Sequence, residues 1–198
     1  MRSKRFLLCL SLFIISELTE LSAQTPAELN FKGVMDQELW LPMKKERSNI
    51  QVGNKASLLV LLSPECPMCI NYTSLLRKIE NKYGNSLQIV GLIPGKTYND
   101  SVVMNFTNSY ELDFPVYVDS TMQLSRYLKG EVTPEAYLFD QSGQLVYRGA
   151  LDNWLSSPGK KRVRADQHYL LDAIEQTLQG HLVALSYVKP QGCLLNEY

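Results

Sequence analysis

The sequence predicts an α/β fold with a central mixed sheet that carries helices on both faces. The apolar runs Ser57–Ser63 and Leu87–Ile93 do not alternate with polar residues, which is typical of strands buried on both faces. Amphipathic helical segments alternate with these strands, an order that indicates a parallel start to the sheet. A later hairpin, turned at Gln141-Ser142-Gly143, adds antiparallel strands.

The first part of the chain supplies an opening hairpin and the longest helix. Phe31–Met35 and Glu38–Leu41 are short strand-like runs that we expect to pair, and Lys44–Lys55 is expected to be a polar loop. Pro67–Tyr83 is predicted to be a helix that ends at Gly84. Apolar residues recur along it at spacings of three and four positions: Cys69, Tyr72, Leu76, Ile79 and Tyr83.

The remaining elements continue the alternation and then close the fold. They are a helix at Asp100–Leu112, a strand at Pro115–Asp119, a short helix at Thr121–Leu128, hairpin strands at Glu135–Asp140 and Gln144–Gly149, a polar loop at Leu151–Asp166 and a last helix at Gln167–Gln179. Asn99 or Asp100 is expected to cap the first of these helices, and Asp166 the last one. A tail follows to Tyr198.

Composition sets the class of protein and makes some functions less favoured. The chain has 198 residues, which at roughly 150 residues per domain predicts one domain. It is 45% hydrophobic and carries 20 basic and 20 acidic residues, so it has no net charge. Because such a chain has no overall field to hold a polyanion, no nucleic-acid partner is expected. No cofactor is predicted.

Residues 1–23 have the pattern of a secretory signal peptide. Basic residues near the start precede Phe6–Ile15, an apolar run too short to span a bilayer, and Ala23 offers a small residue for cleavage before Gln24. Removal of this segment leaves a net charge of −1 and takes Cys9 away. We therefore expect a signal peptide over 1–23, one domain over 24–180 and a tail over 181–198. We expect the protein to be periplasmic or otherwise extracytoplasmic, where disulfides persist, and we expect no membrane span in the mature chain.

The motif Cys66-Pro67-Met68-Cys69 falls where the first buried strand meets the first long helix. Free backbone N–H groups at a helix start stabilise a thiolate, and cysteines so placed have pKa values of about 3.5 to 7.5, against about 8.5 when free. Pro67 suits the first helical turn because its missing N–H would be unpaired there. Cys69 lies one turn along, close enough for a disulfide with Cys66.

These positions predict a redox-active pair in which Cys66 is the exposed attacking thiol and Cys69 the buried resolving thiol. The alternatives are an unreactive pair or half of a zinc site. Zinc commonly needs a second ligand pair, and only Cys193, His168 and His181 remain, without paired spacing.

Several motifs resemble the thioredoxin-like redoxins, a superfamily that includes exported thiol–disulfide reductases and the alkyl hydroperoxide reductase/thiol-specific antioxidant branch. They are the strand–SPECPMC–helix junction at 63–69, FPVYVD at 114–119, VTP at 132–134, YLFDQSG at 137–143 and YRG at 147–149. The resemblance covers about residues 30–150 and implies a thioredoxin-like fold and exchange with protein thiols and disulfides. A redox protein that donates or accepts electrons is a further partner that it implies.

The resemblance also implies that Pro134 is a cis-proline facing the cysteine pair. Proline donates no N–H, so the backbone of Thr133 would stay free to pair with an incoming peptide beside Cys66. Thr133 and Pro134 thereby join Cys66 and Cys69 as expected site residues.

Three positions depart from the family pattern and leave proton transfer at Cys69 unassigned. Glu65 stands where thioredoxins have Trp, Leu58–Leu62 lacks the buried Asp, and Tyr72 replaces a Glu common in exported reductases. Glu65 is a candidate acceptor, or else a solvated acid beside the site. A carboxylate there would also raise the pKa of Cys66, against the effect of the helix end.

Two other functions remain open at this point. Ser63 matches the hydroxyl position of thiol peroxidases, but Leu59 replaces an expected proline and Arg148 is the only nearby candidate for the peroxidase arginine. A Cu(I)-binding module is the other alternative, because Cys66, Met68 and Cys69 supply soft ligands, with the two cysteines as the expected metal ligands. No other metal site is predicted.

Cys193 is the odd cysteine of the mature chain. Three interpretations of Cys193 are open: a buried or idle thiol, a cysteine in an intermolecular disulfide, and a second redox or ligand thiol. Our hypothesis is that Cys193 is partly accessible and exchanges with the Cys66–Cys69 disulfide or binds a metal beside it. Gly192 would let the backbone turn tightly just before the thiol.

Overall fold

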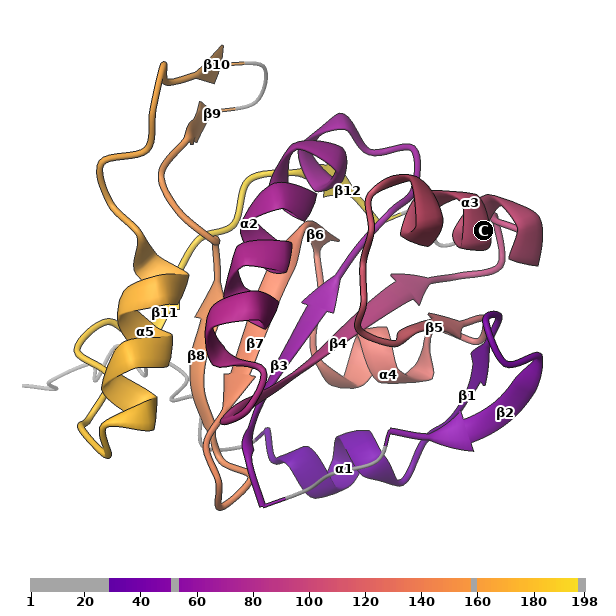
Figure 1. The fold of residues 1–198 in the computed structure, drawn as a ribbon, viewed down its shortest axis with the longest axis horizontal. Coiled ribbons are helices and arrows are strands. Elements are labelled where there is room, and N and C mark those ends of the chain that lie inside the picture. The colour runs from indigo at the N-terminus through magenta and orange to yellow at the C-terminus, as the bar shows by residue number, and fades with distance from the viewer. Residues whose placement is uncertain (1–28, 51–53, 158–159, 196–198) are drawn as a thin grey trace, which may run out of the picture.

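The computed structural model describes residues 29–50, 54–157 and 160–195 (Figure 1). The expected signal peptide at 1–23 lies outside these residues. Within the described ranges, no helix is both long enough and apolar enough to cross a membrane.

A mixed eight-stranded sheet forms the centre of the fold, in the order β11-β8-β7-β3-β4-β5-β1-β2. The strands are β1 (Glu38–Leu41), β2 (Glu46–Asn49), β3 (Ala56–Leu61), β4 (Leu87–Pro94), β5 (Val116–Asp119), β7 (Glu135–Phe139), β8 (Leu145–Gly149) and β11 (Tyr187–Val188). Neighbours are parallel from β3 through β4 to β5 and between β8 and β11. The other pairs are antiparallel, so the predicted mixed sheet is confirmed.

Helices cover both faces of the sheet, as predicted. They are α1 (Phe31–Met35), α2 (Pro67–Tyr83), α3 (Asp100–Ser109), α4 (Gln123–Tyr127) and α5 (Tyr169–Leu178). Buried residues of α2, α3 and α5 share one core cluster, and those of α1 and α4 belong to the other. Strand β3 divides its side chains between the two, with Leu58 and Val60 on one side and Leu59 and Leu61 on the other. This explains its continuous apolar sequence.

The opening hairpin was predicted one element too early. Phe31–Met35 is helix α1 rather than a strand, and Glu38–Leu41 pairs with Glu46–Asn49, within the segment expected to be a loop. The reason is local: the Asn30 side chain accepts a hydrogen bond from the Gly33 N–H at 3.1 Å and caps the helix. Phe31 and Val34 then lie on one buried face, a spacing that a five-residue segment does not distinguish from a strand.

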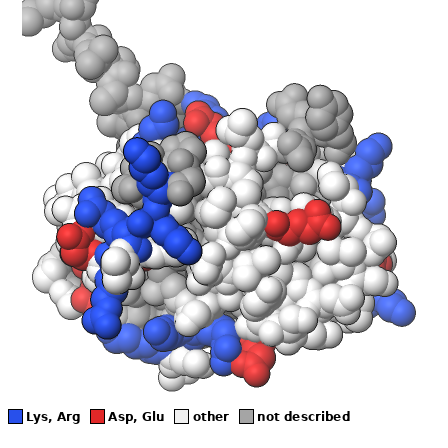
Figure 2. Space-filling view, turned by 90° about the horizontal axis from the view of Figure 1, so that it is seen from above, with Lys and Arg blue, Asp and Glu red and all other residues white. Residues whose placement is uncertain are grey.

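The polar loop at 151–166 and the last helix also differ in detail. The loop contains a small hairpin of β9 (Leu155–Ser157) and β10 (Lys160–Lys161). Figure 2 shows lysine and arginine side chains gathered over this side of the molecule. Asp166 does not cap α5, because its carboxylate accepts a hydrogen bond from the Asn153 side chain, and His168 occupies the cap position. The predicted cap at Asn99 is confirmed, with Val102 N–H donating at 3.1 Å.

The tail is built onto the body of the protein at two places. Strand β11 extends the main sheet beside β8, and β12 (Cys193–Leu194) pairs antiparallel with β6 (Val132–Thr133). The yellow segment in Figure 1 passes from β11 to β12 close to the start of α2. The strand β12 of the tail therefore lies at the junction that carries the CxxC motif.

Candidate active site

Cys66 lies at the N-cap of α2, directly after the loop that leaves β3, as predicted. Its backbone is extended, with φ −76° and ψ 115°, and Pro67 is the first helical residue. The side chain was expected to be exposed, but it is only 3% accessible because the tail covers it. The helix start that favours a thiolate is therefore formed. The Cys66 sulfur, however, does not face open solvent while the Cys66–Cys193 disulfide is present.

The disulfide in the structure joins Cys66 to Cys193, with the two Cα atoms 6.2 Å apart. Cys69 is a free thiol, so the expected Cys66–Cys69 pair is not the one present, which corrects that prediction for this state. The pairing of β12 with β6 is the physical reason. It sets Cys193 opposite Thr133, whose carbonyl oxygen lies 3.3 Å from the Cys66 sulfur.

Cys69 is fully buried, as expected for the inner cysteine of the motif. Burial raises the pKa of its thiol to about 12, while hydrogen bonds from the Ser63 N–H and the Thr133 hydroxyl act in the opposite direction. The Ser63 nitrogen is 3.3 Å from the Cys69 sulfur. Cys69 is therefore a neutral thiol near pH 7, held between two hydrogen-bond donors.

The peptide bond between Thr133 and Pro134 is cis, which confirms that prediction. It lies next to Cys66, as expected, because the Thr133 carbonyl faces the Cys66 sulfur. The expectation that the Thr133 backbone is free is wrong for this state, since Cys193 is its register partner. The edge expected to receive a peptide is occupied by the chain's own tail.

An ion pair braces the loop that presents this edge. Glu135 follows Pro134 and is fully buried, and the Arg148 Nε lies 2.8 Å from its carboxylate. The same arginine donates to the Lys129 carbonyl at 2.6 Å, and Glu135 accepts from the Glu131 N–H at 3.2 Å. These bonds tie both ends of β6 to β8. This ion pair was not predicted from the sequence, although Glu135, a charged residue directly after Thr133-Pro134, was the feature that could have indicated it.

The comparisons with known proteins agree with this geometry. The Redoxin family model matches residues 44–158, which is more than half of the chain. The chain belongs to the Redoxin family. The thiol-disulfide oxidoreductase YkuV of Bacillus subtilis (strain 168) is 24% identical over 112 residues, which are 55% of this chain and 75% of that protein. The prediction that this redoxin is an oxidoreductase is thereby confirmed.

Two solved structures show the fold. An uncharacterized conserved protein from Geobacillus kaustophilus matches with a TM-score of 0.71 at 17% identity, covering 81% of this redoxin and 88% of that chain. A secreted Mycobacterium tuberculosis disulfide oxidoreductase, described as homologous to E. coli DsbE, matches with a TM-score of 0.52 at 11% identity, covering 74% and 96%. The thioredoxin-like fold predicted from the sequence is confirmed.

A cavity of about 250 Å³ opens beside the disulfide of this redoxin. Its wall includes Cys66, Cys193, Thr133 and the exposed Glu65, and the Ser63 hydroxyl there is 3.0 Å from the Tyr98 hydroxyl. None of the described residues that line it is lysine or arginine. Arg148, the candidate peroxidase arginine, is held by Glu135 instead. The cation that peroxide reduction requires is therefore not supplied by this cavity's described lining.

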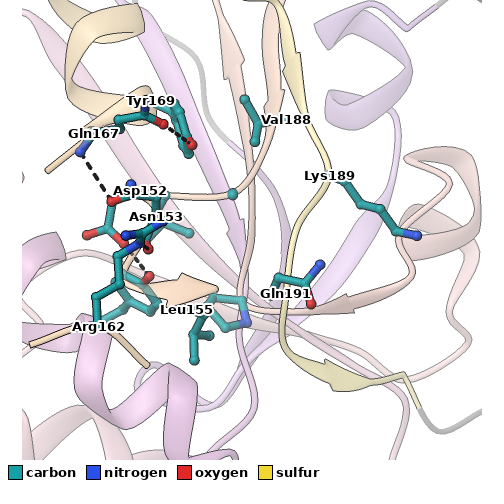
Figure 3. Close-up of a pocket in the computed structure, with 13 residues that line it drawn as sticks. Asp152, Asn153, Leu155, Arg162, Gln167, Tyr169, Val188, Lys189 and Gln191 are labelled. Carbon is teal, nitrogen blue, oxygen red and sulfur yellow. Dashed lines mark hydrogen bonds between the residues drawn. The ribbon is translucent and has the colours of Figure 1, made fainter. Parts of the chain in front are cut away.

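A second cavity, of about 230 Å³, is lined in part by Pro134, and Figure 3 shows it in close-up. Lys189 and Gln191 of the tail form one wall, and Asp152, Asn153 and Arg162 stand opposite. Tyr72 lines it too, with its hydroxyl donating to Asp152 at 2.5 Å. Burial, together with that carboxylate, raises the pKa of Tyr72, so it is a neutral hydrogen-bond donor rather than a base. Residues of the tail thus line both cavities.

The residues considered for metal binding are not brought together. Among the described residues, no three His, Cys, Asp or Glu side chains form a group suited to a metal ion. Of the two cysteines considered for Cu(I), Cys66 is bonded to Cys193 and only Cys69 is a thiol. His168 sits at the start of α5 and His181 beyond its end.

Proposed function

We propose that this redoxin is an extracytoplasmic thiol–disulfide oxidoreductase that exchanges disulfides with protein thiols through Cys66 and Cys69. The observation that carries the proposal is the position of Cys66, at the start of α2 and 3.3 Å from the carbonyl oxygen that precedes cis-Pro134. A cysteine there has a stabilised thiolate and an adjacent backbone edge for a peptide.

In the reduced protein Cys66 is the nucleophile. Its thiolate attacks one sulfur of a substrate disulfide, that S–S bond breaks, and a Cys66–substrate disulfide forms while the second substrate sulfur leaves as a thiolate. Cys69 then loses its proton and attacks the Cys66 sulfur. The Cys66–Cys69 bond forms, the substrate leaves reduced, and the protein has lost the two electrons that the substrate gained. The reverse sequence oxidises a substrate dithiol.

The proposed setting is the periplasm or another extracytoplasmic space. The basic start, the short apolar run and the small residue before Gln24 support a signal peptide over 1–23. A domain over 24–180 and a tail over 181–198 would remain after cleavage. A second redox protein that supplies or removes electrons is the partner that completes the cycle.

Turnover of a disulfide-bonded model protein tests this function. We expect reduction in the presence of a thiol reductant, and complete loss in Cys66→Ser. Iodoacetamide at neutral pH should label Cys66 before Cys69 in the reduced protein; faster labelling of Cys69 would refute the assignment. Titration of the disulfide in redox buffers then gives the direction of electron flow, because a reduction potential of about −270 mV suits a reductase and one of about −120 mV suits an oxidant.

A further inference from the structure

The strand β12 of the tail makes the main-chain contacts that an incoming peptide would make. Cys193 pairs antiparallel with Thr133, and Leu194 pairs with Val132. The Leu195 N–H donates to the Glu131 carbonyl at 3.1 Å, which continues the pairing by one residue. Recognition by strand addition works in this way, with affinity from the main chain and selectivity from alternate side chains.

Side chains on this strand alternate between solvent and protein. Leu194 is 78% exposed, whereas Leu195 packs against the core cluster that contains Leu61. The Leu195 side chain also lies close to Gly130, where an added Cβ would meet it at 3.4 Å. The second residue after the cysteine, Leu195, therefore binds in an apolar site, whereas the first one, Leu194, does not.

The residue before the cysteine has the strictest fit. A Cβ atom added to Gly192 would lie 2.2 Å from the Thr133 oxygen and 2.7 Å from its carbonyl carbon. Both are backbone atoms, so neither can move aside as a flexible side chain can. The tight turn expected at Gly192 is not the reason for glycine, because its φ is not positive. Close approach to the cis-proline loop is the reason.

We propose that residues 191–195 are an intramolecular substrate mimic, and that the external substrate is an extended segment with glycine before its reactive cysteine and an apolar residue two positions after it. The inference rests on the proposed function and adds its substrate class. The Cys66–Cys193 bond corresponds to the enzyme–substrate disulfide, held by the same strand pairing. The tail and the substrate then exclude one another at β6.

The exchange that opens the site is balanced within the chain. The Cys69 thiolate attacks the Cys66 sulfur, the Cys66–Cys193 bond breaks and the Cys66–Cys69 bond forms. Cys193 leaves as a thiolate and takes a proton, so one thiol and one disulfide are present before and after. No external oxidant or reductant takes part.

The tail stays near its site after release because β11 holds it to β8. The Arg148 N–H donates to the Ser186 carbonyl at 2.9 Å, and the Ala150 N–H donates to the Val188 carbonyl at 3.0 Å. An anchored strand competes with substrate at a high effective concentration. The substrate must therefore match the mimic well, which is why the sequence of the tail indicates the preference.

Activated peptides test the preference in the full chain carrying Cys193→Ser, which removes the covalent block. Four peptides copy residues 189–195 with the cysteine as its thionitrobenzoate disulfide: the native sequence, and variants with Gly192→Ala, Leu194→Ser or Leu195→Ser. Cys66 attacks the peptide sulfur and releases the coloured thionitrobenzoate thiolate. All four share one leaving group, so rate differences report recognition.

We expect the native peptide to react about tenfold faster than the Gly192→Ala and Leu195→Ser peptides, and as fast as the Leu194→Ser control. The control substrate is the symmetric disulfide of thionitrobenzoate (the dimer), a small molecule whose reaction with Cys66 needs no strand pairing. If the dimer fails to react, the proposed function is refuted and the inference falls with it. If the dimer reacts but all four peptides react alike, the substrate mimic is refuted and the oxidoreductase stands.

The tail itself supplies the second readout. Gly192→Ala in the otherwise unaltered chain should lower the equilibrium constant for the Cys66–Cys193 disulfide in glutathione buffers about tenfold, measured by thiol blocking and peptide mass mapping. Leu182→Ala is the matched control, since Leu182 lies in the same tail and is 96% exposed. An unchanged constant in Gly192→Ala would contradict the steric argument.

Discussion

The two cysteines that compete for Cys66 lie in contrasting surroundings. Cys69 is three residues away on α2, fully buried, and a thiol whose pKa burial raises to about 12. Cys193 is 127 residues away on a strand of the tail, half-buried, and bonded to Cys66. Closeness in sequence therefore does not decide the pairing. The strand pairing of β12 with β6 supplies the proximity that the helix supplies to Cys69.

The contrast separates two roles for sulfur beside one nucleophile. A buried neutral thiol attacks slowly, because only its thiolate is reactive. A cysteine on an edge strand is held by main-chain bonds that another strand can replace. Cys69 on α2 is thus a slowly reacting partner that always lies beside Cys66, whereas Cys193 on the tail is a partner that another strand can displace.

The largest effects are expected when either partner of Cys66 is removed. In Cys69→Ser the Cys66–Cys69 form is eliminated, so we expect oxidation to stop at Cys66–Cys193 and turnover of a protein disulfide to fall at least about a hundredfold. Cys193→Ser, the same chemical change on the other side, should direct oxidation to Cys66–Cys69. Peptide mass mapping of blocked samples identifies the bonds. Undiminished turnover by Cys69→Ser would show that Cys69 is not the resolving thiol.

The pH dependence of the internal exchange sharpens the difference in pKa. Conversion of the Cys66–Cys193 form to the Cys66–Cys69 form requires the Cys69 thiolate, whose fraction rises about tenfold per pH unit until the pKa is reached. Because burial raises that pKa to about 12, we expect the rate to increase throughout the range from pH 7 to about 10, with no plateau.

Acid quenching and peptide mass mapping measure this rate, starting from protein oxidised at low pH. Cys69→Ser is the control for exchange that bypasses Cys69. A plateau near the value of an ordinary cysteine, about 8.5, would mean that Cys69 becomes solvated before it attacks.

The anchor of the tail gives the smallest expected effect. The Tyr187 ring of β11 lies 5.9 Å from the Arg148 guanidinium carbon, and such a contact contributes about 0.5–1 kcal/mol. Tyr187→Ala should therefore lower the equilibrium constant of the Cys66–Cys193 disulfide about two- to fivefold, in the same glutathione assay. Leu182→Ala again provides the reference. A shift equal to that of Leu182→Ala would show that the Tyr187 ring contact plays no part in holding the tail.

Periodicity was sufficient for most of the fold because the long elements bury one clear face. The bounds of α2 were predicted to the residue, and β3 and β4 to within two residues. The short elements were harder. Five residues at Phe31–Met35 do not distinguish a helix from a strand without the contribution of the Asn30 cap.

The active site was predictable where it depends on local sequence. Cys66 at the helix start and cis-Pro134 followed from the motif and the resemblance. The Cys66–Cys193 bond did not, because it depends on a two-residue strand pairing between segments 60 residues apart along the chain. No periodicity is visible in a strand that short. The sequence predicted that Cys193 exchanges with the Cys66–Cys69 disulfide or binds a metal beside it, but it did not predict a disulfide between Cys66 and Cys193.

The disulfide between Cys66 and Cys193 also turns most of the molecule into a covalent ring. A loop of this length removes about 5 kcal/mol of chain entropy from the unfolded state in the standard model. The ring encloses every element from α2 to β11 and closes only when β6 and β12 have met. The same bond that shields the nucleophile therefore also stabilises the finished fold, so that molecules with the Cys66–Cys193 bond resist unfolding more than molecules that are reduced or carry the Cys66–Cys69 bond.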